Sequence, residues 1–340
     1  MNTNTKEKKE LLDLTIYAFN KVRTPEREAA FFKLLDFSTP YTHREKDELT
    51  SMVIDSHFEV FWKSQKVKMS GLGYVASYPE FRGNGGIRKI MTKLLRDNYE
   101  VGTALSYLAP FSYEFYGKFG YAYSFDRKVY TIPAYAFPIG KKGTGEITRK
   151  PLKDIATREL WLELNGIHEK SYNQGSLARS QDNWEYYFLH KFQPQVAIYR
   201  EAGEAQGYLL YDFSGKTFEI IELISQTTEA KEALYRFISS HAGQFENFRW
   251  TTTPDMTLEY DMTEPEYAQI QLVPYMQARI VNLTEFLKVN GLPSFSAEVV
   301  DELIPENNII VGSGQIEKMT IGEFTAKVLR ENQAIIREYF

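Results

Sequence analysis

The residues with the clearest chemical potential form the glycine-rich segment Arg82-Gly83-Asn84-Gly85-Gly86-Ile87. The run after it places apolar residues at helical spacing, at Ile87, Ile90, Met91, Leu94 and Leu95. Glycines let backbone N–H groups approach a ligand closely, and a helix start adds unbonded N–H groups and a positive dipole end. Arg88 adds a charge in the first turn. This pattern indicates an anion site suited to a pyrophosphate, and a plain tight turn that caps the helix is the alternative.

Two other phosphate-binding loops do not fit this segment. The sequence has no Gly-x-x-x-x-Gly-Lys-Ser/Thr motif. A dinucleotide fold needs a strand, turn and helix near the chain start, with an acidic residue about 20 positions further on. Here several β-rich runs, with the character of antiparallel strands, come before the turn.

A second motif follows the next predicted strand, Thr103–Ala109: the string Phe115-Tyr-Gly-Lys-Phe-Gly-Tyr121. With Val75, Pro79 and segment 82–87, it resembles the Eis (enhanced intracellular survival) branch of the GNAT N-acetyltransferases. The glycine-rich segment looks like the acetyl-CoA signature of that family, Arg/Gln-x-x-Gly-x-Gly/Ala. The resemblance continues at Met276–Leu283 and in the aromatic residues at the C-terminus.

The resemblance implies an activity and a set of site residues. Eis-like proteins acetylate amines of aminoglycosides or lysines and are often hexamers, so we expect a small-molecule amine acceptor and a homo-oligomer. Tyr116 matches the family's proposed general acid, and the free carboxylate of Phe340 matches its proposed general base. The acetyl-CoA contacts carried over by the signature are Val75, Arg82, Gly83, Asn84, Gly85, Gly86, Ile87 and Arg88.

These residue types suit acyl transfer to an amine. A primary amine is protonated at pH 7, so a nearby carboxylate must accept a proton before the amine can attack a thioester. A tyrosine hydroxyl can protonate the departing thiolate, and backbone N–H groups near Val75 can polarise the thioester oxygen. With no cysteine in the chain, direct transfer is the consistent mechanism. Core packing is the structural alternative for Tyr116, and a packed tail is the alternative for Phe340.

The elements around these motifs form a repeated pattern. Helices are expected over residues 9–20 and 25–35, and strands over Leu49–Ile54, Phe58–Trp62 and Val67–Ala76. The order of three strands, a helix and a strand recurs over residues 196–252, after a linker-like stretch at Pro133–Gly145. The second copy has Ile224–Ala230 in place of the glycine-rich turn, so no phosphate site is expected there.

We therefore expect an α+β protein with mixed sheets. The predicted domains are an N-terminal GNAT domain with the acetyl-CoA site over 1–135 and a degenerate second GNAT domain over 136–275. A domain similar to sterol carrier protein 2 (SCP2) is expected over 276–340, as the resemblance implies. GNAT domains usually begin with a strand, whereas Met1–Lys8 has no strand pattern. That first strand is either lost or replaced.

Composition limits the remaining function classes. The chain has 340 residues, a net charge of −5, 5 His and no Cys. The acidic balance argues against a broad nucleic-acid surface, and the histidines lack metal-ligand spacing, so neither nucleic acid nor metal is expected. No apolar run of about 18 residues occurs and Met1–Glu10 is polar, which predicts a cytoplasmic protein without a membrane partner. A non-catalytic module that holds acyl-CoA or another small ligand is the alternative to an enzyme.

Overall fold

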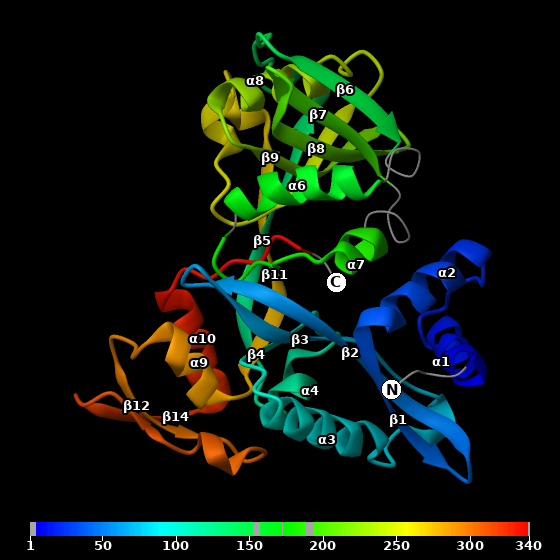
Figure 1. Cartoon of the computed structure of the whole chain (residues 1–340), viewed down its shortest axis with the longest axis vertical. Coiled ribbons are helices and arrows are strands. Elements are labelled where there is room, and N and C mark those ends of the chain that lie inside the picture. Colours follow the sequence, from blue (N-terminus) through cyan, green and yellow to red (C-terminus); the bar gives the residue numbers. More distant parts are fainter. Residues whose placement is uncertain (1–4, 152–156, 172, 188–193, 339–340) are drawn as a thin grey trace. The chain divides into compact units, whose positions relative to one another are not determined.

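The computed structural model describes residues 5–151, 157–171, 173–187 and 194–338. The chain divides into two compact units (Figure 1). Unit 1 contains Met1–Phe125, Gln174–Asp182 and Tyr275–Phe340. Unit 2 contains Asp126–Asn173 and Asn183–Pro274. Segments far apart in the sequence therefore fold together in unit 1, while the predicted three-domain division stays a prediction.

The sheet of unit 1 holds both sequence motifs at its parallel strand pair. Its strands, in spatial order, are β1 (Ser38–Glu45), β2 (Glu48–Trp62), β3 (Gln65–Ser77), β4 (Leu105–Leu108) and the C-terminal part of β11 (Gln269–Ile280). Neighbouring strands are antiparallel except β3 and β4, which are parallel. The β2–β3 hairpin turns at Lys63 and Ser64, both at positive φ, as a two-residue turn of the right twist requires.

One strand prediction in this sheet is wrong, and the sequence does not predict β1. Residues 49–62 form one strand rather than two, because Asp55 and Ser56, which interrupt the apolar pattern, are themselves buried. The exposed charged run 44–48 contains a two-residue turn at Lys46 and Asp47 between β1 and β2. Strand β1 is half-buried at the sheet edge, so its sequence carries no alternating apolar signal.

The helices of unit 1 lie on this sheet (Figure 1). They are α1 (Thr5–Ala18), α2 (Pro25–Leu34), α3 (Gly86–Glu100) and the short α4 (Tyr113–Gly117). The predicted apolar stripe of α3 packs into a core cluster with β2, β3 and β4 residues. The first described element is α1, and residues 1–4, where a first GNAT strand was in question, lie outside the described residues.

The C-terminal part of unit 1 carries a small second sheet. Its elements are α9 (Leu283–Asn290), β12 (Ser296–Val300), β13 (Ile310–Val311), β14 (Ile316–Thr320) and α10 (Ile321–Glu331). The strand order is β13-β12-β14. Strand β11 ends at Ile280, because Asn282 caps α9 by accepting a hydrogen bond from Glu285 N. The likeness to SCP2 stays a prediction.

Unit 2 repeats the strand pattern of unit 1, as the sequence predicts. Its sheet order is β5 (Ala122–Pro133), β10 (Asn247–Thr252), β9 (Thr217–Ser225), β8 (Glu204–Ser214), β7 (Gln195–Glu201) and β6 (Glu146–Pro151). The described helices are α6 (Arg158–Lys170) and α8 (Thr228–Ser239), and α7 (Gln181–Trp184) begins in unit 1 and ends in unit 2. Strands β9 and β10 are the parallel pair, joined through α8 as β3 and β4 are through α3.

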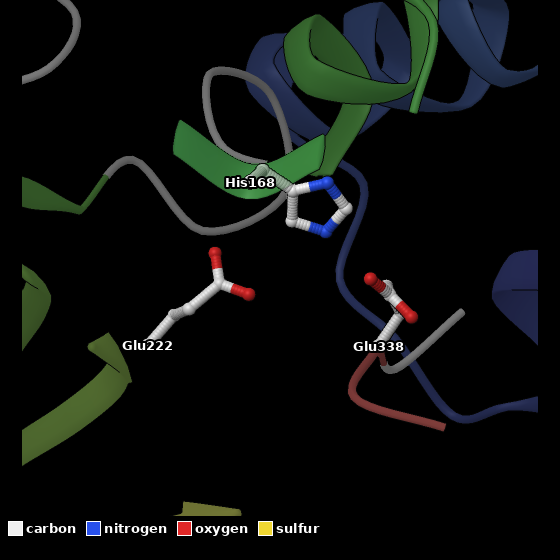
Figure 2. Close-up of side chains that lie close together, drawn as sticks. All are labelled: His168, Glu222 and Glu338. Atoms are coloured by element: carbon white, nitrogen blue, oxygen red, sulfur yellow. The ribbon is translucent and has the colours of Figure 1, made fainter. Parts of the chain in front are cut away.

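Polar residues are also buried within unit 2. His168 in the last turn of α6 and Glu222 on β9 are both buried (Figure 2). Glu222 accepts a hydrogen bond from the Tyr208 hydroxyl at 2.9 Å. The expected absence of a metal stays a prediction. Among the described residues, no helix is long and apolar enough to cross a membrane.

Candidate functional site

A bulge in β3 marks the point where the two parallel strands of unit 1 stop pairing. The β2–β3 register runs from Ile54↔Gly73 to Met52↔Ala76, so Tyr74 and Val75 together oppose one β2 residue. Tyr74 has φ +51°, which is uncommon for a bulky residue. Strand β3 pairs with β4 only as far as Leu72 and then continues to Ser77 paired with β2 alone. A bulge of this kind redirects backbone groups, and here it does so at Val75.

The glycine-rich segment leads into the start of α3. Gly83 and Gly85 have φ +86° and +78°, and a Cβ on either would meet nothing within 4 Å. Gly86 differs, because its Cβ would lie 2.8 Å from Ser51 Oγ. Gly85 is the N-cap residue of α3 and no side chain caps the helix. The first N–H groups of α3 therefore have no side-chain acceptor. The loop that precedes them has open space at Gly83 and Gly85.

Helix α8 of unit 2 is built differently at the matching position. Its N-cap is Thr227, whose hydroxyl accepts a hydrogen bond from Ala230 N at 3.0 Å. An intramolecular acceptor thus occupies the N–H group that an anion would need. This cap favours the expectation that unit 2 lacks a phosphate cradle, which stays a prediction.

Basic side chains extend from the uncapped end of α3 along its exposed face. Arg88, Lys89, Lys93 and Arg96 line an open hollow of about 610 Å³ that begins at Gly85. Lys93 is paired with Asp97, and Arg96 with Glu100 and Glu306. Arg88 has no ion-pair partner in the part of the chain that the structure describes, so its charge is not offset by a neighbouring carboxylate.

Tyr116 lies on α4 in an aromatic environment. It is 2% exposed, and its ring centroid lies 5.2 Å from that of Phe111 and 5.0 Å from that of Phe115. Its hydroxyl has no hydrogen-bond partner among the described residues. Burial raises the pKa of Tyr116 well above the usual tyrosine value, so the hydroxyl is protonated at neutral pH and able to donate.

A segment from the middle of the chain extends the sheet of unit 1 beside β2. Gly175 N donates to Phe61 O at 2.8 Å, and Phe61 N donates to Ser176 O at 2.9 Å. Ala178 N donates to Glu59 O at 2.8 Å. Residues 174–179 are therefore held on β2 by main-chain hydrogen bonds.

The C-terminal residues in turn bind this segment. Glu338, labelled in Figure 2, forms a buried ion pair with Arg179 at 2.9 Å, with side-chain exposures of 5% and 3%. The same carboxylate accepts a hydrogen bond from Leu177 N at 3.0 Å, and Tyr275 donates to the Glu338 carbonyl at 3.0 Å. The chain is thus fixed up to residue 338. The proposed base, Phe340, lies outside the described residues.

Two residues of β2, Asp55 and Trp62, are buried in the core. Asp55 is fully enclosed and accepts hydrogen bonds from Ser70 and Asn98, each at 2.6 Å, so it supports the core beneath α3 rather than lining a pocket. Trp62 is 0% exposed and bonds to Asn290. Sequence reasoning missed the Arg179–Glu338 pair, for which no local signal exists because the partners are separated by 159 residues.

Comparison with known proteins decides the family. Residues 2–124 match one model of the acetyltransferase (GNAT) domain, and residues 175–280 match another. A crystal structure from Enterococcus faecalis V583, described as a conserved protein of unknown function and probable N-acyltransferase, is 32% identical. The match covers 99% of this chain and 98% of that chain, with a TM-score of 0.88. The chain belongs to the GNAT family.

More distant GNAT structures share the fold. A GCN5-related N-acetyltransferase from Anabaena variabilis ATCC 29413 is 16% identical over 100% of this chain and 97% of that chain, with a TM-score of 0.81. Eis1 from Mycobacterium abscessus is 19% identical over 96% of this chain and 88% of that chain, with a TM-score of 0.77. No curated protein matches the chain. This GNAT protein is an N-acyltransferase, and its domains imply an acyl-CoA co-substrate.

Proposed function

We propose that this GNAT protein transfers an acetyl group from acetyl-CoA directly to a primary amine of the aminoglycoside, polyamine or lysine type. The observation that carries the proposal is the uncapped start of α3, which follows the end of β3 that β4 does not pair, in the same unit as a buried, protonated Tyr116. The Eis resemblance supplies the acceptor class. A net charge of −5 is compatible with a cationic acceptor.

The residues around segment 82–87 fit the pyrophosphate of acetyl-CoA. The open space at Gly83 and Gly85 allows phosphate oxygens to approach the N–H groups of Gly83 and of residues 85–87, and the α3 dipole favours their negative charge. Arg82 and Arg88 are exposed and add positive charge. Asn84 and Gly86 complete the loop. Val75 lies where β3 departs from β4, so the Val75 N–H is our candidate to polarise the thioester oxygen.

Two protein groups carry the proton transfers of the reaction. The neutral amine nitrogen attacks the thioester carbon, and the bond to sulfur breaks as the amide forms. Tyr116 donates its proton to the departing thiolate and regains a proton from solvent. The carboxylate of Phe340 accepts the proton that the amine loses, directly or through water.

The anchored tail supports the role of Phe340. Glu338 is held by Arg179, Leu177 and Tyr275, and residue 340 is two positions further on. A chain extended beyond Phe340 would replace this carboxylate by a peptide bond and is expected to lose turnover while still binding acetyl-CoA.

The test measures CoA release by thiol titration with aminoglycosides, polyamines, lysine peptides and arylalkylamines as acceptors. The protein has no Cys, so it adds no thiol background. Turnover with one amine class would identify the acceptor. Acetyl-CoA binding without turnover across the panel would favour the ligand-holding module, and absence of binding would contradict the proposed role of residues 82–87. The hexamer and the cytoplasmic location stay predictions, the first to be checked by mass in solution.

A further inference from the structure

A fully buried arginine connects the C-terminal part of unit 1 to the motif that carries Tyr116. The Arg279 side chain, on β11, is 0% exposed, and its ion-pair partner Asp301 is 1% exposed. One guanidinium nitrogen donates to Asp301 Oδ2 at 2.5 Å. Another donates to the carbonyl oxygen of Phe119, three residues after Tyr116.

That carbonyl belongs to the turn that closes around Tyr116. The Tyr116 carbonyl accepts hydrogen bonds from Phe119 N at 2.9 Å and from Tyr121 N at 3.3 Å. A second β11 residue, Gln277, donates to the carbonyls of Tyr113 at 3.2 Å and Tyr121 at 3.3 Å. Side chains from β11 therefore hold the main chain on both sides of Tyr116.

Close packing leaves this turn little freedom. Gly120 has φ +78°, and a Cβ there would lie 2.3 Å from an Arg279 nitrogen and 2.8 Å from Ile321 Cγ2. A Cβ on Gly322 of α10 would lie 3.1 Å from the Gly120 carbonyl oxygen. The second glycine of the Phe-Tyr-Gly-Lys-Phe-Gly motif is therefore required by contact with Arg279 and with the start of α10.

Asp301 is itself held by several donors. Its Oδ1 accepts from Leu303 N at 3.0 Å and from Ile304 N at 3.1 Å, and its Oδ2 accepts from Asn307 at 2.9 Å. Apolar residues of similar volume can often replace a buried ion pair without loss of stability. Space filling alone therefore does not account for a charge at position 279, whereas a directed hydrogen bond to Phe119 does.

We propose that Arg279, with Asp301 and Gln277, is a positioning residue that orients the Tyr116 hydroxyl for proton donation. The C-terminal part of unit 1 thereby acts on the acyl-transfer step without contacting the substrates. This inference rests on the proposed role of Tyr116 as the general acid.

The first variant is Arg279→Lys, which keeps the charge beside Asp301 but lacks the planar fork that reaches two acceptors. We expect kcat to fall about 10- to 100-fold, the size that small misplacements of catalytic groups produce, while the KM for acetyl-CoA changes less than about twofold. Gln277→Leu is the second variant and is expected to lower kcat in the same way. Val328→Ala is the control, because Val328 is a buried α10 residue outside this hydrogen-bond set.

The deciding experiment combines each variant with Tyr116→Phe. If Arg279 and Gln277 act through the Tyr116 hydroxyl, they lower kcat no further once that hydroxyl is gone. Losses that multiply in the Tyr116→Phe background would overturn the positioning role, as would kcat losses no larger than that of Val328→Ala. Full activity of Tyr116→Phe alone would instead overturn the general acid itself. If Arg279→Lys does not fold, the Gln277→Leu cycle decides the question alone.

Discussion

Tyr116 owes its proposed function to its surroundings rather than to its residue type. The chain contains 23 Tyr, several of them buried, and Tyr116 combines a buried ring, a hydroxyl with no hydrogen-bond partner among the described residues and a place in motif 115–121. The Tyr107 hydroxyl is also buried without a partner, but Tyr107 lies outside that motif. Tyr121, five residues after Tyr116, hydrogen-bonds to Ser106 at 2.7 Å. A hydroxyl that is already hydrogen-bonded in the core is a poorer proton donor to a substrate. We therefore assign the proton donation to Tyr116 and a structural role to Tyr121.

The pH dependence tests Tyr116 at the residue scale. The active form is protonated, and burial raises its pKa, so activity would be lost only as the pH rises through a value above the ordinary tyrosine pKa of about 10. The acceptor amine deprotonates as the pH rises, so we expect kcat/KM to increase from pH 7 to about 9 without a fall due to Tyr116. Tyr116→Phe should lower kcat about 10²- to 10⁴-fold. A decline below pH 9.5 that Tyr116→Phe removes would contradict this assignment.

Gly83 offers a second residue-scale test with a matched control. Gly83 and Gly203 both have φ +86° and open space where a Cβ would stand. Alanine at either position should cost about 1 kcal/mol of folding stability through backbone strain. Only Gly83→Ala should also raise the KM for acetyl-CoA, because its methyl group enters the space proposed for the pyrophosphate. Equal KM values for the two variants would show that segment 82–87 is only a turn.

At the scale of elements, the start of a helix distinguishes the two GNAT domains. Helix α3 begins at a glycine without a side-chain cap, and α8 begins at Thr227, which caps it. The same strand–helix–strand unit therefore has no side-chain acceptor at the start of its helix in one domain, and an acceptor for Ala230 N in the other. The bulge in β3 does not distinguish the domains, because β9 also shifts register against its antiparallel neighbour β8 just after its parallel pairing with β10 ends at Ile220.

The C-terminal tail is a second element whose anchoring can be measured. Glu338→Gln breaks a buried ion pair with Arg179, and removing one partner of such a pair typically costs about 3–5 kcal/mol of folding free energy. We expect a loss of about that size in urea denaturation. Glu246→Gln removes an exposed ion pair with Lys216 and is expected to change stability little. If both variants change the free energy of unfolding by a similar, small amount, the Arg179–Glu338 pair does not hold the tail.

At the scale of the whole molecule, the two GNAT domains predict one acetyl-CoA site per chain. Calorimetric titration should give a stoichiometry near one, and Gly83→Ala should weaken the binding. Thr227→Ala removes the α8 cap, at a cost of about 1 kcal/mol in stability, and should leave the stoichiometry unchanged. Two equivalent sites per chain would contradict the assignment of unit 2 as the domain without a cofactor site.

Local patterns in the sequence were sufficient for the features that depend on neighbouring residues. The stripe of α3 follows from its apolar spacing, the loop from glycines that adopt positive φ, and the repeated domain order from alternating strands and helices. The proposed proton donor could be named because Tyr116 lies in a motif rather than alone.

Only the tertiary structure decided the features that depend on residues distant in the chain. Arg179 meets Glu338 across 159 residues and Arg279 meets Phe119 across 160, and neither pair leaves a pattern in its own segment. Strand β2 runs through Asp55 because partners on β3 and α3 satisfy its carboxylate. Burial of a polar group is stable only with such partners, and those partners are brought together by folding.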